Sequence, residues 1–175
     1  ILGVHDFMPN NKLIKLLAGT MCDSPVKLVC ENIIFLIAGA DTKNFNETRM
    51  PVYLRHVPAG TSVQNIVHFS QMVRSNKFQM YNYGSESANL KHYGQEVPPV
   101  YDLNSVDIPV VLFSADHDTL ADPTDVKTLK DALPNVVYSE EIKGWNHLDF
   151  IWGVNANAKV YKKIIKIISE DYKKM

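Results

Sequence analysis

The sequence predicts an α/β protein, in which parallel strands alternate with helices, most clearly over residues 103–175. An uninterrupted apolar run of strand length follows Pro109, and a second strand-like segment covers residues 136–142. A helical pattern follows each of them after a short link. Buried parallel strands have continuous apolar sequences, and strand–helix alternation is typical of a parallel sheet.

Residues 1–102 show helical stretches that are separated by irregular polar segments. Apolar residues recur at helical spacing in three segments, namely residues 12–18, 26–38 and 63–76. Thr61 or Ser62 is placed to cap the third helix. Its predicted buried face consists of Val63, Ile66, Val67, Ser70 and Val73. Residues 81–101 contain aromatic and polar residues and two adjacent prolines, which predict a long loop between the two halves.

The two helices of the second half carry clear end signals. Asp122 is placed as an N-cap, Pro123 suits a first turn, and Asp125 lies near the positive end of the helix dipole. This helix is expected to run to about residue 133, and residues 144–149 predict a loop after the second strand. The last helix, residues 157–172, is expected to bury Val160, Ile164, Ile167 and Ile168.

Composition excludes several classes of function. The chain of 175 residues is 46% hydrophobic and 21% charged, which is typical of a soluble globular protein. Its formal net charge of -1 and the absence of interleaved basic and aromatic residues argue against nucleic-acid binding. The longest apolar run, residues 33–40, is far shorter than the roughly 20 residues of a membrane span.

No signal peptide is visible, and the start at Ile1 predicts that an N-terminal part of the same chain precedes this residue.

Chemistry is expected at the loops that follow the two strands, because open α/β sheets bind ligands beyond the carboxyl ends of their strands. Asp118 lies in the first of these loops and His147 in the second. An acid followed by a histidine is the order in which an α/β-hydrolase carries these two groups, with a serine before both. A carboxylate fixes the imidazole tautomer and stabilises the imidazolium that proton transfer creates.

Other interpretations of these loops remain open on position alone. His147 could be a solvated or hydrogen-bonded bystander. Asp116, Asp118 and Asp122 resemble a calcium loop, but the sixth and twelfth positions hold Ala121 and Lys127 instead of the required Gly and Glu. Asp122 is better explained as a helix cap and Asp116 as a strand-end residue, so Asp118 is the preferred acid.

No nucleophile or cofactor motif stands out in the chain. The nearest approach to a G-x-S-x-G elbow is at Gly60 and Ser62, but Gln64 replaces the second glycine and no strand-like run precedes it. Ser62 is therefore interpreted as a helix start. The histidines show no metal-ligand spacing, and no glycine-rich phosphate loop is present.

The cysteines and one asparagine bear on the compartment. Cys22 and Cys30 fit neither a redox motif nor a zinc set, so they are either two buried thiols or a small-loop disulfide. A disulfide requires an oxidising compartment. Asn46 begins an N-glycosylation sequon, a weak signal that points the same way.

The sequence resembles the acid lipase family, which includes gastric, lysosomal and epidermal lipases. The matching stretches keep the family's order over nearly the whole chain: residues 44–49, 52–54, 58–65, 77–79, 92–93, 98–101, 118–123 and 147–153. The resemblance implies the C-terminal part of an α/β-hydrolase core together with part of an inserted helical cap and lid. Residues 1–102 correspond to the later part of the cap, and residues 103–175 to the last core segment.

The resemblance also implies a function and its residues. The family's catalytic aspartate falls on Asp118 and its histidine on His147, whereas its serine and oxyanion-hole donors lie in a preceding part. Its glycosylated asparagine falls on Asn46, and its disulfide on Cys22 and Cys30. Lipid esters such as triglycerides or cholesteryl esters, met at a lipid–water interface, are the implied substrates. No metal or organic cofactor is needed, and the secretory pathway, lysosomal or extracellular, is the implied location.

Three rival interpretations remain at the level of sequence. A family member that has lost catalysis could serve as a lipid-binding or interaction module. The presence of an upstream G-x-S-x-G motif would distinguish an active lipase from such an inactive member. Another α/β-hydrolase chemistry could use the same Asp/His pair, although the cap motifs argue against it. A truncated product is the third, and residues 1–175 alone are expected to have no esterase activity.

Overall fold

The described part of the chain consists of helices and two separate two-stranded sheets. A computed structural model describes residues 6–7, 44–49, 52–53, 55–57 and 59–173. The helices predicted at 12–18 and 26–38, and the cysteines Cys22 and Cys30, lie outside the described residues. Within them, no helix is long and apolar enough to cross a membrane.

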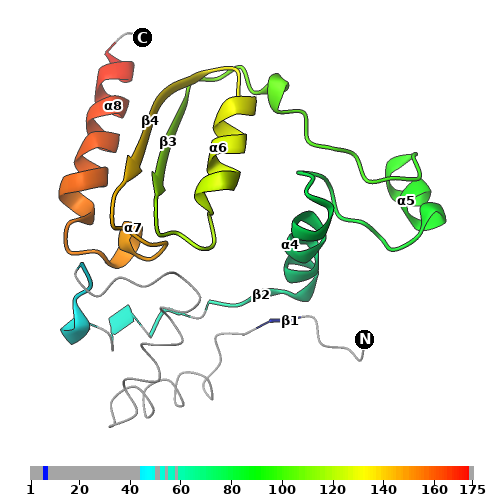
Figure 1. The fold of residues 1–175 in the computed structure, drawn as a ribbon, viewed down its shortest axis with the longest axis horizontal. Coiled ribbons are helices and arrows are strands. Elements are labelled where there is room, and N and C mark those ends of the chain that lie inside the picture. Colours follow the sequence, from blue (N-terminus) through cyan, green and yellow to red (C-terminus); the bar gives the residue numbers. More distant parts are fainter. Residues whose placement is uncertain (1–5, 8–43, 50–51, 54, 58, 174–175) are drawn as a thin grey trace.

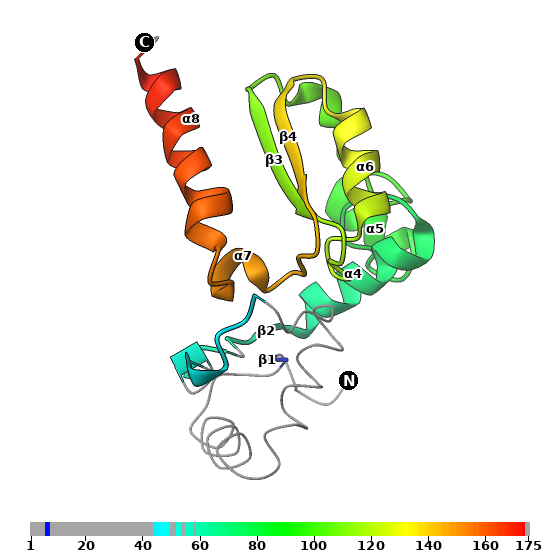
Figure 2. The same ribbon diagram turned by 60° about the vertical axis from the view of Figure 1, so that its left-hand side comes forward.

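A parallel strand pair forms the centre of the second half, as predicted. β3 (Val110–Ala115) and β4 (Val136–Ile142) pair in parallel, with Ala115 opposite Ile142 at their carboxyl ends. The crossover between them is α6 (Pro123–Ala132). Figures 1 and 2 place α6 and α8 (Lys162–Tyr172) on opposite sides of the strand pair.

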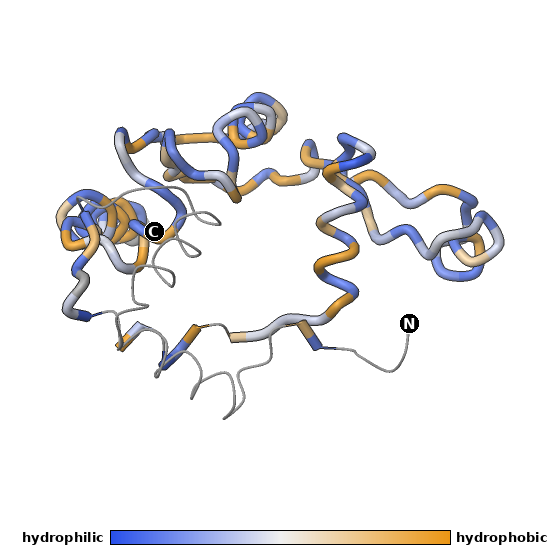
Figure 3. Tube along the Cα trace, turned by 60° about the horizontal axis from the view of Figure 1, so that its bottom comes forward, coloured by the Kyte–Doolittle hydropathy of each residue, from blue (hydrophilic) through white to orange (hydrophobic). Residues whose placement is uncertain are grey.

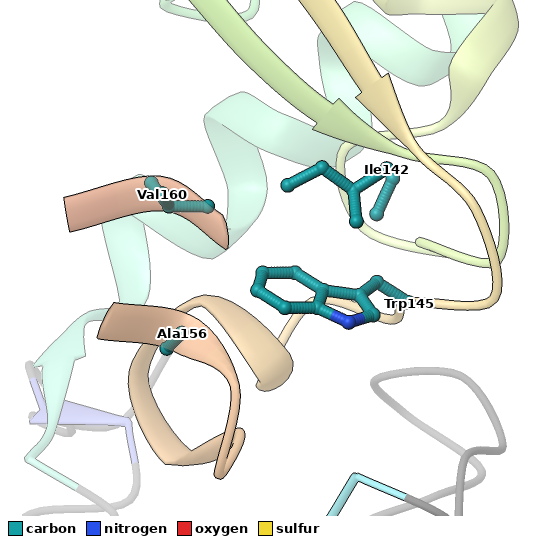
Figure 4. Packing of buried hydrophobic residues seen from close by; sticks show 5 residues of the cluster. Ile142, Trp145, Ala156 and Val160 are labelled. Carbon is teal, nitrogen blue, oxygen red and sulfur yellow. The ribbon is translucent and has the colours of Figure 1, made fainter. Parts of the chain in front are cut away.

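The buried core lies at the carboxyl ends of these strands. It contains Ala115, Ile142, Trp145, Ala156 and Val160, with Phe113, Phe150 and Ile164 packed against it. Figure 4 shows the indole of Trp145 between Ile142 and the helical turns that carry Ala156 and Val160. The Trp145 and Phe150 rings also meet edge to face, with centroids 5.4 Å apart. Because Trp145 is held in this way, the loop that follows β4 has a fixed position over the core.

The segment predicted as the last helix, residues 157–172, is not one uniform α-helix. The segment predicted as one helix begins with the π-helical turn η3 (Asn157–Tyr161), which follows the short α7 (Asp149–Trp152), and continues as α8. Val160 is buried as expected, but Ile168 remains 62% exposed. Ile164 and Ile167, which follow the π-turn, are half-buried, and of these helix positions the core contacts Ile164 but not Ile168. Figure 3 shows hydrophobic and hydrophilic residues alternating around α8.

An ion pair fastens α8 to β4. Both carboxylate oxygens of Glu140 accept hydrogen bonds from Lys163 Nζ, at 2.5 and 2.6 Å. The Lys163 ammonium, with the Tyr138 hydroxyl, lowers the pKa of Glu140, and the Glu140 carboxylate raises the pKa of Lys163. A lowered carboxyl pKa stabilises the fold above the unfolded value of about 4.3, and this contribution is lost as the pH falls through the lower folded value. The raised lysine pKa acts only at alkaline pH, where stability is lost as the pH rises through it.

Glu140→Gln is therefore expected to lower the melting temperature of the complete protein by a few degrees at neutral pH. The difference in melting temperature between the wild type and the variant should shrink as the pH falls below the pKa of the carboxyl group in the unfolded chain. Thermal unfolding across an acid-to-neutral pH series measures this. Glu141→Gln is the matched control, because Glu141 pairs with Lys143 on the exposed surface. An unchanged difference at every pH would contradict the expectation.

α4 (Val63–Ser75) is the longest described helix of the first half and begins where the sequence predicts. Ser62 is its N-cap, with Oγ accepting the Asn65 N–H at 3.0 Å. Val63 and Val67 are half-buried, whereas Ile66 is 40% and Val73 67% exposed, contrary to the predicted buried face. Among the described elements, the short strands β1 (Asp6–Phe7) and β2 (Thr61–Ser62) pack against this helix, so its later turns are less covered.

The segment predicted as a long loop contains a helix, so that prediction is wrong. α5 (Glu86–Tyr93) is capped by Ser85 and ends at Gly94, which has a φ of 71°. It has little apolar periodicity, which explains why the pattern gave no signal. The buried Asn89 side chain accepts the Tyr83 N–H and donates to the Glu96 carbonyl, so polar contacts hold this segment together. Two short 3₁₀ helices complete the described elements, η1 (Glu47–Arg49) and η2 (Leu103–Ser105).

Candidate functional site

Two loops meet at the carboxyl edge of the strand pair. Because β3 and β4 are parallel, the segments that follow them emerge at the same edge. The His117 N–H donates to the Trp145 carbonyl at 3.0 Å, and Asp116 Oδ1 accepts the Gly144 N–H at 2.7 Å. Gly144 has a φ of 74°, a left-handed conformation that glycine adopts readily. These bonds hold the two loops against each other.

The structure brings Asp118 and His147 into contact across these loops. His147 Nδ1 lies 3.1 Å from Asp118 Oδ2, although the residues are 29 positions apart. Asp118 is buried, with 4% of its surface exposed, whereas the His147 side chain is 43% exposed. The buried carboxylate therefore lies below a histidine whose ring reaches the surface.

The second carboxylate oxygen of Asp118 is also fixed. Oδ1 accepts the backbone N–H groups of Leu120 at 2.9 Å and Ala121 at 2.8 Å. These bonds leave Oδ2 for the imidazole, and a carboxylate offers only lone pairs, so Nδ1 of His147 carries the shared hydrogen. Nε2 then presents a lone pair, and within the described part of the chain no group hydrogen-bonds to it. This arrangement suits a general base that takes a proton from a neighbouring nucleophile.

The remaining aspartates of the first loop have separate partners, which argues against a shared cation. Asp116 bonds Gly144, and Asp122 caps α6 by accepting the Thr124 N–H at 2.8 Å, as predicted. The N–H of Thr124 lowers the pKa of the Asp122 carboxyl. Across the described residues, no cluster of three histidine, cysteine or acidic side chains could hold a metal ion.

An apolar groove runs between α4 and α6. Its volume is about 500 Å³, and one of its lining residues is Ala121, whose N–H bonds Asp118. Its apolar lining comes from both halves of the chain and includes Phe69, Met72, Val73, Phe78, Leu103, Val126 and Leu129. The exposed Val73 thus faces the groove instead of a packed core. The groove therefore offers hydrophobic surface that includes Ala121, a residue bonded to the buried carboxylate.

The Asn46 sequon forms a compact turn. Asn46 Oδ1 accepts the Thr48 N–H at 3.2 Å and the Thr48 hydroxyl at 2.7 Å. Both residues lie at least partly exposed.

Sequence reasoning missed a buried polar cluster below the histidine loop. Asn44, Asn146 and Asp149 are each at most 5% exposed. Asp149 Oδ1 accepts Asn44 Nδ2–H at 2.8 Å, across 105 positions of sequence. Asn146 and Asp149 could have been suspected from the sequence, because they lie close to His147. The residues around Asn44 carry no comparable sign that its side chain joins this cluster.

No family model matches the chain, but curated relatives match nearly all of it. It is 46% identical over 174 residues to the gastric triacylglycerol lipase of Homo sapiens, covering 99% of this chain and 44% of that lipase. It is 41% identical over 169 residues to the lysosomal acid lipase/cholesteryl ester hydrolase of Homo sapiens, covering 96% and 42%. It is 45% identical over 177 residues to the lipase lipl-1 of Caenorhabditis elegans, covering 98% and 43%. The chain thus spans less than half the length of these relatives.

Proposed function

This chain belongs to the acid lipase family, and on that premise we propose that it supplies the acid and the base of a Ser-His-Asp triad that hydrolyses carboxylic esters of lipids. The relatives are named as hydrolases of triacylglycerols and of cholesteryl esters. These esters, or related acyl lipids, are the proposed substrate class. The protein acts on them at a lipid–water interface.

In the proposed mechanism, each group has one task. A serine supplied by residues outside these 175 attacks the ester carbonyl, and His147 Nε2 takes its proton. The imidazolium then protonates the leaving alcohol, and the acyl group stays on the serine. Water, deprotonated by the same nitrogen, releases the fatty acid and restores the serine. Asp118 orients the imidazole and stabilises its positive charge. No step requires a metal or an organic cofactor.

The observation that carries the proposal is the 3.1 Å contact between His147 Nδ1 and Asp118 Oδ2. The burial of Asp118 strengthens its interaction with the imidazolium, because water screens it little. The groove between α4 and α6 supports a lipid substrate, since an acyl chain needs apolar surface near the reacting carbonyl. We assign residues 1–102 to the cap and lid insertion and residues 103–175 to the catalytic core.

The proposal is tested with the complete protein, an emulsified triacylglycerol, a cholesteryl ester and a fluorophosphonate probe. The expected result is hydrolysis of at least one ester, with the probe attached covalently to a serine outside residues 1–175. Hydrolysis that is unaffected by full labelling of the protein would contradict the serine mechanism. Binding of lipid without hydrolysis or labelling would favour a catalytically inactive lipid-binding member.

Passage through the secretory pathway, towards the lysosome or the exterior, is part of the proposal, and Asn46 provides its test. In protein expressed in a eukaryotic secretory host, a glycosidase that removes N-linked glycans is expected to lower the apparent mass, and Asn46→Gln should reduce that shift by one glycan. Asn44→Gln is not a usable control, because Asn44 is buried. Asn65→Gln is suitable, since Asn65 lies outside any sequon. An unmodified Asn46 would contradict the assignment.

A further inference from the structure

We infer that the buried hydrogen bond between Asn44 and Asp149 positions the base, by fastening the histidine loop to a segment from the first half of the chain. This inference rests on the proposed function, because it assumes that His147 acts as the base. Asn44 and Asp149 are positioning residues in this scheme, and they act through His147 without touching the substrate.

Asp149 fixes the loop from inside. Its Oδ2 accepts the Asn146 N–H at 2.8 Å, and the Asn146 side chain in turn accepts the N–H groups of Leu148 and Asp149, at 2.8 and 3.2 Å. These bonds hold the residues immediately before and after His147. A buried carboxylate is tolerated only where hydrogen bonds replace its lost hydration, so the loop is held in the one conformation that provides them.

Asn44 connects this loop to the first half of the chain. Its Nδ2–H donates to Asp149 Oδ1 at 2.8 Å, its Oδ1 accepts the Asn155 N–H at 3.3 Å, and its backbone carbonyl accepts the Val154 N–H at 2.9 Å. Phe45 forms an isolated β-bridge with Gly153 beside it. The position of His147 therefore depends on residues from both halves.

The space that Asn44 occupies exists because residue 153 has no side chain. A Cβ at Gly153 would lie 2.4 Å from Asn44 Nδ2 and 2.5 Å from the Asp149 carbonyl oxygen. Its backbone, with φ of -62° and ψ of 132°, is one that any residue can adopt. Glycine is thus required for the close approach alone, and Gly153→Ala is expected to displace Asn44 together with the Asp149 backbone carbonyl of α7.

Single exchanges of amide and carboxylate cannot satisfy this cluster. In Asp149→Asn, one side-chain atom must accept from Asn44 and the other from Asn146, but an amide has only one oxygen. In Asn44→Asp, two carboxylates face each other, and neither supplies a hydrogen. Each single variant is expected to shift the loop, and a displacement of about 1 Å at a catalytic group can lower turnover by about 10²-fold.

The double exchange, Asn44→Asp with Asp149→Asn, satisfies every hydrogen bond described for the pair. The amide introduced at position 149 would accept the Asn146 N–H and donate to the carboxylate introduced at position 44. That carboxylate would still accept the Asn155 N–H through its other oxygen. The double variant preserves the size and the net charge of the pair and each of the hydrogen bonds just named. It is therefore expected to recover the activity that each single variant loses.

The experiment measures kcat and KM of the complete protein on a soluble short-chain ester, for the wild type, both single variants, the double variant and Gly153→Ala. Thermal unfolding measures the fraction of folded protein in each preparation, so that kcat refers to folded enzyme. Asp149→Asn and Asn44→Asp are expected to lower kcat between about 10- and 100-fold with little change in KM, and the double variant to return to near the wild-type kcat. Gly153→Ala should lower kcat in the same way.

Tyr53→Phe is the matched control within the same contact. It removes the Tyr53 hydroxyl bond to the Trp152 carbonyl at 3.4 Å and retains the ring that stacks on Trp152 at 4.8 Å. Its kcat should equal that of the wild type. Unchanged kcat in the single variants, or a double variant no better than the single ones in kcat and in yield of folded protein, overturns the inference. His147→Ala is assayed alongside: if it keeps full turnover, the proposed function fails, whereas its loss beside an active Asp149→Asn variant rejects this inference alone.

Discussion

Replacing His147 by alanine is expected to lower the kcat of the complete protein by about 10⁶-fold, or about 8 kcal/mol in the activation free energy, as removal of the base does in the serine hydrolase series. The physical reason is that no other described group offers a lone pair where Nε2 lies, since Asp118 is buried and two backbone N–H groups hold its carboxylate below that position. KM should change little, because the ring takes part in proton transfer more than in ground-state binding. Steady-state kinetics on a soluble ester measures the effect.

His117→Ala is the matched control for this variant. His117 is an exposed histidine in the opposing loop, and its backbone N–H makes the contact with Trp145 that holds the loops together. Removing its imidazole leaves that contact in place, so turnover should remain within a few-fold of the wild type. If the two alanine variants lost activity equally, or if His147→Ala stayed active, His147 could not be the base.

The second large effect is expected from Asp118→Asn, at about 10⁴-fold in kcat by analogy with the serine-protease triad. The structure gives the reason. The N–H groups of Leu120 and Ala121 require an acceptor, so they keep the oxygen of the introduced amide on their side. The amide nitrogen then faces His147 Nδ1 and donates to it. This places the imidazole hydrogen on Nε2, where it cannot accept the proton of a nucleophile.

This variant should retain its fold, because both backbone contacts survive the change. Thermal unfolding should therefore show a small shift beside the large kinetic loss. Asp122→Asn is the control, since asparagine also caps helices well and Asp122 has no contact with the imidazole. Full activity in Asp118→Asn would remove the aspartate from the mechanism, and equal losses in both variants would point to damage of the loop instead.

Much of the second half follows from local sequence signals. The apolar run after Pro109 is β3, Asp122 caps α6 as expected, and residues 136–142 pair in parallel with β3. Such signals succeed because the periodicity of a strand or helix and the capping of its ends depend on neighbouring residues.

Other features depended on contacts that have no local signature. The sequence pattern did not predict α5, because hydrogen bonds of the Asn89 side chain stabilise this segment and the helix has no apolar stripe. Ile168 is predicted to be buried but is 62% exposed, because the core contacts α8 at Ile164 and does not extend to Ile168. A search for apolar residues at a uniform helical spacing therefore predicts neither the helix α5 nor the exposure of Ile168.

By itself, the sequence determined the alternation of strands and helices, their main caps, and the two residues proposed as acid and base. Only the tertiary structure decided that Asp118 and His147 meet at 3.1 Å, that backbone N–H groups hold the aspartate, and that Asn44 reaches Asp149 across 105 positions. The reason is physical. Periodicity and capping are properties of a short stretch of chain, whereas the partner of a buried polar group is set by how distant segments pack.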